Sequence, residues 1–550
     1  MAFLKSLIAL FLAFFAALNP FDGPNEVPRE PSKYYYEYLE YPEEAIVTLD
    51  EAGLSVNQFT SRADDDGDEL FLNAQGYTDI NGIIESPYFD IYVEAKYVPS
   101  YATTVFVGET QKGALHSFSE IYVDSSKDFA LAFQLNTYSF FINDVKIFSP
   151  SGKQIFTFGS NVVNTTIKEL GTYTFVFNKN DQQHAFSLFV RELVDEEQKI
   201  ADLKAEYGES NVVVVEKGFH NTDAFFNLYG SNNMVYYLKR GAYLLAKHTY
   251  DINSDADDQN YVEELALSQA GLGLTRFPYL NFHCSNNVKL LGNGVIDLSH
   301  LDRRERRGIV FSYCNNVEVD GMKIINAPEW SFITYDCENV TIKNVDIFGY
   351  RQNSDAFAIC NTRNATIDNS FCRSGDDLFD VKAAGGRDEA ISQNITFTNC
   401  TAWNGKARCF GICGEVYKDI KDITFRDSTV IFHDATWNKD RIPALAIVVE
   451  DGSVGSISNV TFENIDVYDA RSRAIGCLIY GSAVENLSIT GITYKNISYN
   501  APLKTKVASN GKTTNTVQTT FENVYANGNK ITQLDNNIFE YDKYATITIK

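Results

Sequence analysis

A short motif recurs through the second half of the chain, and it constrains the fold more than any other feature. Each copy opens with Asn or Asp in a polar turn and continues as a short strand of alternating apolar and polar residues. Copies begin at Asn287, Asn316, Asn339, Asn364, Asn394, Asp422, Asn459 and Asn486, at steps of 23 to 37 residues, most of them under 31. A constant motif at uneven intervals is typical of a parallel β-helix, whose turns absorb insertions while its sheets keep stacking. The leucine ladder of a leucine-rich repeat and the longer, even blades of a propeller are not seen.

The preceding part of the chain has a different pattern. Residues from about 61 to 190 alternate apolar and polar positions between turn signals, which predicts an antiparallel β-sandwich. Residues 192–207 are mostly charged, with a few spaced apolar side chains, which predicts a connecting amphipathic helix. We therefore expect an all-β protein with a β-sandwich domain over residues 24–207 and a parallel β-helix over residues 211–550.

The first residues have the pattern of a targeting signal. A short charged start is followed by an almost wholly apolar run that ends at Leu18, before Asn19-Pro20. This run is short for a membrane span, so residues 1–18 are predicted to be a cleaved signal peptide, with an uncleaved anchor as the alternative. No other stretch approaches transmembrane length. We expect a secreted protein that has no contact with a membrane after cleavage.

Composition restricts the partners. The 550 residues are 44% hydrophobic and 13% aromatic, enough for two or more domains with sizeable cores. The net charge of -25 argues against nucleic acid, which requires a dense Lys/Arg surface. A polyanionic substrate stays open because a local basic cleft can exist on an acidic protein. We expect a monomer.

Cysteine and asparagine residues follow the repeat. Cys284, Cys314, Cys337 and Cys360 each precede a polar turn. We interpret them as a stacked interior column of small side chains, with disulfides or metal ligands as alternatives. Eight Asn-x-Ser/Thr triplets begin at Asn164, Asn339, Asn364, Asn394, Asn399, Asn459, Asn486 and Asn496. Most coincide with repeat turns, which favours a structural role over glycosylation.

One aspartate and a pair of adjacent aspartates are separated by about one turn of the repeat. Twenty-one residues separate Asp355 from Asp376, which is followed directly by Asp377. One turn returns the chain to the same edge, about 4.8 Å further along, so the three carboxylates are expected on one face. Such a cluster is what acid/base hydrolysis of a glycosidic bond requires. Adjacent residues of a strand point to opposite faces, so Asp376 and Asp377 can share a cleft only if the backbone bends, which Gly375 allows. The alternative is that the Asp-Asp pair only forms a turn.

The residues around these aspartates resemble a known family. The runs Asn353-Ser354-Asp355-Ala356-Phe357-Ala358-Ile359 and Gly375-Asp376-Asp377, followed by Lys382, are similar to those of the polygalacturonases of glycoside hydrolase family 28. The resemblance implies a right-handed, pectin-lyase-like β-helix and inverting hydrolysis without metal or organic cofactor. It further implies that Asp376 is the general acid and that Asp355 and Asp377 activate the water.

Two further motifs of that family are altered. Lys406-Ala407-Arg408-Cys409-Phe410-Gly411 stands where the family has Gly-His-Gly, and Arg441-Ile442-Pro443 where it has Arg-Ile-Lys. In that family the His and Lys that are missing here help to bind a uronate. Their absence therefore argues against galacturonan as the substrate. The chain is also similar to family 49, the dextranase and isopullulanase group, which couples an N-terminal β-sandwich to a β-helix and acts on neutral α-glucans.

These observations predict a secreted, inverting, polygalacturonase-like glycoside hydrolase that acts on a polysaccharide. Lys382, Arg408, Arg441 and Trp403 are the predicted substrate-binding residues, and no metal site is expected. The alternatives are a dextranase-like hydrolase, a non-catalytic carbohydrate-binding β-helix, and a lyase or epimerase on the same fold. The acidic runs at residues 62–68 and 255–258 are interpreted as solvated turns, because the first lacks the downstream Glu of a calcium loop.

Overall fold

The computed structural model describes residues 34–47, 59–63, 69–73, 82–106, 114–137, 139–152, 154–178, 184–222, 226–247, 278–301, 306–384, 389–435 and 438–550. The expected signal peptide and the acidic residues 64–68 and 255–258 lie outside these ranges. Residues Tyr36–Lys550 form one compact unit. None of the helices in the described ranges combines the length and the apolar character needed to cross a bilayer.

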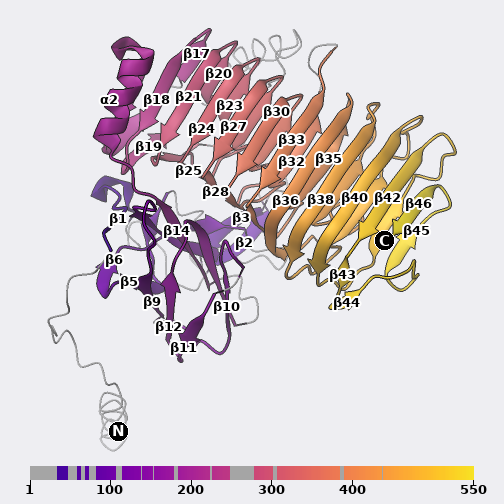
Figure 1. The fold of residues 1–550 in the computed structure, drawn as a ribbon, viewed down its shortest axis with the longest axis horizontal. Helices are drawn as coiled ribbons and strands as arrows, with labels where there is room; N and C mark the ends of the chain where they lie inside the picture. Colours follow the sequence, from indigo (N-terminus) through magenta and orange to yellow (C-terminus); the bar gives the residue numbers. More distant parts are fainter. Residues whose placement is uncertain are drawn as a thin grey trace, which may run out of the picture. The chain divides into compact units, whose positions relative to one another are not determined.

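Two sheets form the N-terminal β-sandwich (Figure 1). The seven-stranded sheet contains β1 (Tyr36–Tyr38), β4 (Ile84–Glu85), β7 (Tyr101–Val105), β8 (Ala114–Val123), β10 (Val145–Phe148), β13 (Gly171–Phe177) and β14 (His184–Glu192). The five-stranded sheet contains β5 (Phe89–Val93), β6 (Lys96–Val98), β9 (Leu131–Thr137), β11 (Phe156–Phe158) and β12 (Val162–Ile167). Phenylalanines join the sheets: Phe89 stacks on Phe177 at 5.5 Å, and Phe133 lies 5.4 Å from Phe175. All pairings are antiparallel except that of β8 with β14, and β2 (Phe59–Ala63) forms a separate hairpin with β3 (Glu69–Asn73).

A helix precedes the repeat region. Helix α2 (Glu196–Tyr207) begins after Asp195, whose carboxylate accepts a hydrogen bond from the Gln198 amide and so caps the helix. Its apolar residues Ile200 and Leu203 pack on the first strands of the β-helix. The short 3-10 helices η1 (Glu43–Ala45) and η2 (Glu209–Asn211) complete the helical content of the described residues.

The described residues from Val212 onward form a right-handed parallel β-helix with three strands in a typical turn, as the repeat and the family resemblance predicted. An eleven-stranded sheet contains β17 (Phe226–Tyr229), β20 (Pro278–His283), β23 (Arg307–Ser312), β26 (Phe332–Tyr335), β29 (Phe357–Cys360), β32 (Phe379–Ala383), β35 (Phe410–Val416), β37 (Leu445–Val449), β39 (Ile475–Ile479), β41 (Thr505–Ala508) and β45 (Phe539–Tyr541). We call it the site sheet, because the candidate site lies at its edge. All its pairings are parallel, and its strands lie side by side in Figure 1.

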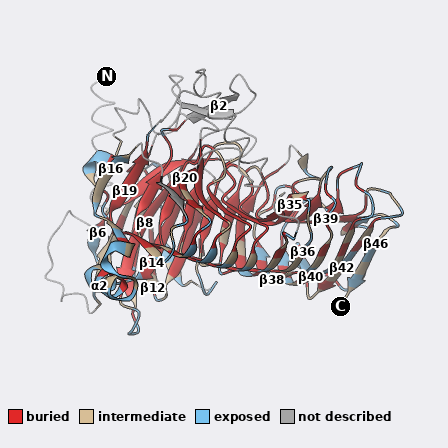
Figure 2. Cartoon of the chain, turned by 90° about the horizontal axis from the view of Figure 1, so that it is seen from above, coloured by how far each residue is buried: buried red, intermediate tan, exposed pale blue. Residues whose placement is uncertain are grey.

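The other two strands of each turn join a 21-stranded sheet. It contains β15 (Val212–Val215), β16 (Gly218–Thr222), β18 (Met234–Leu238), β19 (Ala242–Ala246), β21 (Asn286–Gly292), β22 (Val295–Asp297), β24 (Asn315–Asp320), β25 (Lys323–Ile325), β27 (Glu338–Lys343), β28 (Asp346–Phe348), β30 (Arg363–Asp368), β31 (Phe371–Arg373), β33 (Ser392–Thr398), β34 (Thr401–Asn404), β36 (Ile420–His433), β38 (Ile457–Val467), β40 (Ser488–Tyr499), β42 (Thr516–Glu522), β43 (Tyr525–Ala526), β44 (Asn529–Lys530) and β46 (Ala545–Ile549). Figure 2 shows the buried residues, in red, running along these strands.

Stacked aromatic side chains and asparagines hold successive turns in register. Inside the β-helix, Phe357, Phe379 and Phe410 stack, with ring centroids 5.6 and 4.8 Å apart. At the turns, the Asn394 amide donates to the Asn364 carbonyl oxygen at 2.8 Å, and Asn364 donates to the corresponding oxygen one turn earlier. Side-chain amides of six of the eight triplet asparagines donate to a side-chain oxygen one turn earlier, which belongs to an asparagine in four cases and to an aspartate for Asn399 and Asn459: Asn339, Asn364, Asn394, Asn399, Asn459 and Asn496. These bonds support the structural interpretation of the repeat asparagines.

The cysteines only partly form the expected column. None of the nine, all within the described ranges, forms a disulfide. Cys314 and Cys337 are neighbours in the core of the β-helix. Cys284 is exposed, and Cys360 packs in a separate cluster with Ala358 and Tyr335. The column prediction is therefore wrong for the two outer members, because Cys284 itself lies in the turn after β20, with φ of +52°, and the side chain of Cys360 on β29 packs outside the core.

The sandwich packs against the β-helix through apolar and charged contacts. Phe118 of β8 stacks on Phe348 of β28 at 5.2 Å. Beside them, Nη2 of Arg191 donates to both carboxylate oxygens of Asp346, at 2.7 and 2.8 Å, and both side chains are buried. A buried pair of this kind is costly to break, because one partner would be left as an uncompensated charge.

Candidate active site

The three aspartates lie at one edge of the site sheet. Phe357 of β29 pairs in register with Phe379 of β32, so Asp355 and Asp377, each two residues earlier, occupy equivalent places on successive turns. The Ala356 amide donates to the Asp377 carbonyl oxygen at 2.8 Å across this edge. Asp355, Asp376 and Asp377 line the same pocket, which has a volume of about 240 Å³. The interval of one turn thus brings them together.

A tight bend directs both members of the doublet into the pocket. A side chain on Gly375 would place its Cβ 2.2 Å from the Arg351 carbonyl oxygen, so close backbone approach requires glycine here. The Asp376 carboxylate accepts from the Asn353 amide at 3.1 Å and from the Asp377 amide at 3.0 Å. These bonds fix the Asp376 carboxylate to its own turn and to the preceding turn of the β-helix.

The three carboxyl groups have different electrostatic environments. Burial and the neighbouring Asp377 raise the pKa of Asp376 to about 6. Burial and then Asp376 raise the pKa of Asp355 well above its usual value. Burial opposes the ionisation of Asp377, but the Arg408 guanidinium and Lys382 hold its pKa below the usual value. Asp355 and Asp377 are 4% and 3% exposed, whereas Asp376 is more accessible from the pocket.

Three of the four predicted substrate-binding residues line this pocket, and all three are paired with carboxylates. Lys382 Nζ lies 2.8 Å from Asp380 and 3.0 Å from Glu415. Its distance to Asp355 is 3.6 Å. The guanidinium of Arg408 lies 2.9 Å from Asp377 and 3.0 Å from Glu450. Arg441 forms two hydrogen bonds of 2.6 Å with Glu450.

Trp403 does not line the pocket, so its expected role in substrate binding is corrected. Its side chain is 0% exposed and packs between the β-helix and the sandwich, with Val176 and Ala185. The Arg373 guanidinium lies 4.1 Å from its ring centroid, a cation–π contact. Trp330 does line the pocket, and Lys382 Nζ lies 5.1 Å from its ring centroid.

The acidic partners of these cations were not predicted from the sequence. Asp380 and Lys382 are two residues apart on strand β32, so they share a face, and this spacing was a signal of an ion pair. Burial raises the pKa of Asp380 to about 7. Glu415 and Glu450 reach the site from the next two strands of the site sheet, a relationship that no local spacing reveals.

One group in the described residues has the composition of a metal site. Possible ligand atoms of Asp377, Asp380 and Cys413 lie within 4.8 Å of one another. Burial raises the pKa of the Cys413 thiol well above its usual value. Lys382 and Arg408 already balance the two carboxylates. These residues therefore do not fit a metal ion and form ion pairs instead.

Comparisons with known proteins agree with the resemblance seen in the sequence. The sequence model of glycosyl hydrolases family 28 matches residues 293–540. The polygalacturonase QRT2 of Arabidopsis thaliana is 25% identical over 198 residues, covering 34% of this chain and 42% of that protein. A polygalacturonase of Chamaecyparis obtusa is 24% identical over 245 residues, covering 40% of this chain and 45% of that protein. The chain thus spans less than half the length of these relatives.

A solved structure supports the fold over most of the chain. The structure of Dex49A from Penicillium minioluteum superposes with a TM-score of 0.59 and 10% sequence identity, covering 85% of this chain and 95% of that chain. This likeness confirms the predicted β-sandwich and β-helix. The predicted resemblances to family 28 and, as close second, to family 49 are also confirmed.

Proposed function

We propose that a chain matching family 28 over residues 293–540 is a secreted glycoside hydrolase that cleaves a polysaccharide with inversion. The observation that carries the proposal is the cluster of Asp355, Asp376 and Asp377 in one pocket, with one raised pKa near 6 and one lowered pKa. Inverting hydrolysis requires a protonated carboxyl and an ionised carboxylate at the same bond. The secretion rests on residues 1–18 alone, and we propose a monomer without nucleic-acid or membrane partners.

Asp376 acts as the general acid. It is the most accessible of the three carboxyls, and its pKa of about 6 keeps it protonated in mildly acidic solution. Its proton passes to the glycosidic oxygen as the bond to the anomeric carbon breaks.

Asp377 acts as the general base. Its lowered pKa keeps it ionised, so it takes a proton from water while the water oxygen bonds to the anomeric carbon from the opposite face. Burial and then Asp376 raise the pKa of Asp355, which orients the same water. The family resemblance assigns the activation of the water to Asp355 and Asp377 together, and the opposite shifts of their pKa values divide these roles.

The experiment is an assay of the secreted protein on pectic polysaccharides and α-glucans. We expect released reducing ends, with the first-formed anomer inverted by NMR, and no unsaturated product absorbing in the ultraviolet. Asp376→Asn should abolish the release while leaving the circular dichroism spectrum unchanged. A fully active Asp376→Asn protein, or an unsaturated product, would contradict the proposal, and binding without cleavage would identify a carbohydrate-binding β-helix.

A second candidate, hydrolysis of a neutral polysaccharide, is favoured by the charges of the pocket. Six acidic residues line it: Asp355, Asp376, Asp377, Glu415, Glu450 and Asp451. Its three basic residues are each held by a carboxylate. Every basic residue that lines the pocket already has a carboxylate partner, so none is left to pair with a uronate. The excess of negative charge would also repel a uronate. Comparing initial rates on dextran and polygalacturonate distinguishes the two candidates.

A further inference from the structure

Asn404 is a buried asparagine behind the aspartate doublet, and no step of the proposed reaction uses it. It ends strand β34 and is 0% exposed. The repeat asparagines have positive φ and bond to side chains of neighbouring turns. Asn404 is not among the residues of positive φ, and the four hydrogen bonds of its side chain all go to backbone groups. The asparagine ladder therefore does not account for it.

The side chain of Asn404 uses the full hydrogen-bonding capacity of an amide. Its Nδ2 donates to the carbonyl oxygens of Asp376, at 2.8 Å, and of Arg408, at 3.0 Å. Its Oδ1 accepts from the backbone amides of Lys406, at 2.8 Å, and of Ala407, at 2.9 Å. Two acceptors on one side and two donors on the other permit only one orientation of the amide group.

These bonds join the turn that carries the acid to the turn that holds the base. Asp376 precedes strand β32, and Arg408 precedes β35, its neighbour in the site sheet. The Arg408 guanidinium lies 2.9 Å from the Asp377 carboxylate. A single side chain therefore fixes the backbone of the acid relative to the cation that keeps the base ionised.

The same side chain also fixes Lys406, a second cation close to the acid. The Lys406 amide donates to Asn404 two residues earlier, as in an Asx turn. The Lys406 ammonium lies 5.0 Å from the ring centroid of Phe106, which follows strand β7 of the sandwich. Burial and Asp377 raise the pKa of Asp376, and the charge of Lys406 opposes that rise. Movement of residues 405–408 would therefore change the charge around both aspartates.

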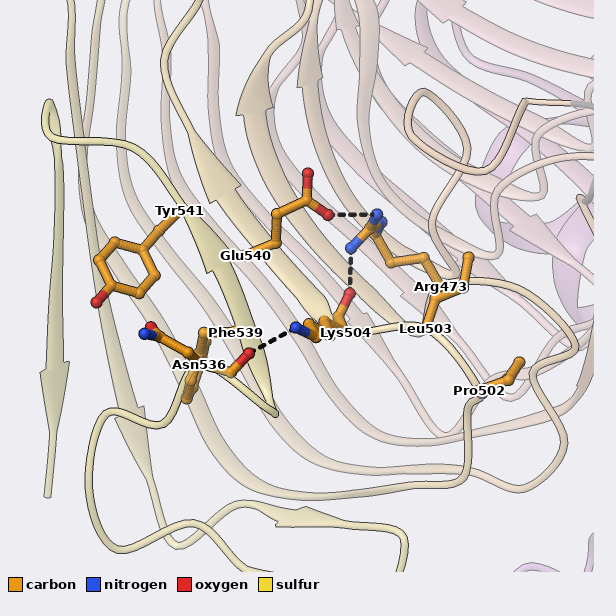
Figure 3. Close-up of a pocket in the computed structure, with 8 residues that line it drawn as sticks. All are labelled: Arg473, Pro502, Leu503, Lys504, Asn536, Phe539, Glu540 and Tyr541. Atoms are coloured by element: carbon orange, nitrogen blue, oxygen red, sulfur yellow. Dashed lines mark hydrogen bonds and ion pairs between the residues drawn. The ribbon is translucent and has the colours of Figure 1, made fainter.

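An arginine at this sheet edge does not by itself require such an asparagine. Arg473 takes the place of Arg408 two turns further along the site sheet, since each precedes its strand by two residues. Its guanidinium is held by Glu540 and by the Lys504 carbonyl oxygen (Figure 3). The residue four positions before it is Asp469, whereas an asparagine stands four positions before Arg408. The buried asparagine is thus a feature of the turn beside the aspartates.

We propose that Asn404 is a positioning residue that fixes the acid Asp376 relative to the base Asp377 by holding residues 405–408 against the doublet. The inference rests on the proposed function. Asn404 acts through the backbone and through the two cations of this segment, and it makes no contact with the sugar.

The test compares Asn404→Ala with Asn510→Ala in the full-length protein. Asn510 is the matched control, because its Nδ2 also donates to two carbonyl oxygens of the preceding turn, those of Gly481 and Val484, and its Oδ1 accepts from the Lys512 amide. Asn404→Ala is expected to lower kcat about 10- to 100-fold, since small displacements of catalytic groups cost this much. Asn510→Ala should retain kcat. Thermal unfolding measures the loss of stability that the two variants share.

The pH–rate profile separates positioning from a merely structural role. Once residues 405–408 are free, the charge of Arg408 leaves Asp377 and that of Lys406 leaves Asp376, so the pKa of both carboxyls rises. The base must be ionised and the acid protonated, so both limbs of kcat/KM should move to higher pH. Other charged groups that act on the two carboxyls lie outside this segment: Asp355, Asp380, Lys382 and Glu415.

A conservative variant keeps the test open if Asn404→Ala does not fold. The hydroxyl of Asn404→Ser can still accept from a backbone amide of the segment, but it cannot replace both donors. We expect a smaller loss of kcat and a smaller shift of the profile in the same direction. Losses of kcat that are equal in the Asn404 and Asn510 variants, or a profile that stays in place, would overturn the positioning role.

Hydrogen–deuterium exchange separates this inference from the proposed function. In Asn404→Ala the amides of Lys406 and Ala407 lose their acceptor, so the peptide over residues 404–410 should exchange faster than in the wild type. In Asn510→Ala it should be unchanged. If the wild type cleaves no polymer but this peptide exchanges faster in Asn404→Ala, the function fails and the hold on the segment stands. If the wild type is active and Asn404→Ala matches it in kcat and exchange, the function stands and this inference fails.

Discussion

The Arg408 guanidinium lies 2.9 Å from the Asp377 carboxylate, and the Arg408 backbone amide donates to the other oxygen of that carboxylate at 3.0 Å. This double contact lowers the pKa of Asp377 against the effect of burial. The adjacent Asp376 lacks it and has a pKa of about 6. Two consecutive residues of one type thus acquire opposite protonation states, as an acid and a base require.

The first prediction concerns this contact. Arg408→Gln should lower kcat at least about tenfold and move the acidic limb of the pH–rate profile to higher pH. The base works only when ionised, and removing the guanidinium raises the pKa of Asp377, so a higher pH is needed to ionise it. The measurement is kcat/KM between pH 3 and 8. Arg441→Gln is the matched control, because Arg441 pairs with Glu450 instead; an equal shift there would assign the effect to general pocket charge.

The second prediction concerns the basic limb of the profile. Because the acid works only when protonated and Asp376 has a pKa of about 6, wild-type activity should fall as the pH rises through about 6. Asp376→Asn should lose about 100- to 10,000-fold on polysaccharide. On an aryl glycoside with a good leaving group the loss should be much smaller, since that departure needs little protonation. Asp377→Asn should be inactive on both substrates. Equal losses for Asp376→Asn on both would exclude its role as acid.

The third prediction tests the turn that presents the doublet. In Gly375→Ala the new Cβ would meet the Arg351 carbonyl oxygen at 2.2 Å, so one of the two backbone segments must move. We expect a large loss of kcat because small displacements of catalytic groups are costly. Thermal unfolding monitored in parallel shows whether the fold persists. Gly159→Ala is the control, since its Cβ would meet Val162 at an ordinary 3.4 Å; a fully active Gly375→Ala protein would contradict the account of the bend.

The sequence predicts those features that depend on local patterns. The β-helix follows from turn asparagines and alternation within each strand, and the meeting of Asp355 with Asp377 follows from an interval of one turn. Trp403 was misassigned because Val176 and Ala185, which cover it, lie more than 200 residues earlier in the chain. Glu450 was missed because its contact with Arg408 joins separate turns. Contacts between separate turns or domains depend on the conformation of the insertions, which the repeat pattern does not predict.

The last prediction addresses how much the asparagine ladder stabilises the β-helix. Asn364 has φ of +56° and bonds through its side chain to both Asn339 and Asn394. Asn364→Ala loses two hydrogen bonds. It also places alanine, which lacks the polar side chain that favours asparagine there, in the left-handed region. We therefore expect a loss of about 2–4 kcal/mol in the free energy of unfolding.

Asn364→Gly separates the two causes. Glycine adopts the left-handed conformation freely but makes no ladder bonds, so it should recover about 1 kcal/mol relative to alanine. Urea denaturation with the linear extrapolation method measures all three proteins. If glycine were no more stable than alanine, the ladder bonds alone would account for the preference for asparagine. If both variants matched the wild type, the ladder would follow from the stacking of turns and would not stabilise it.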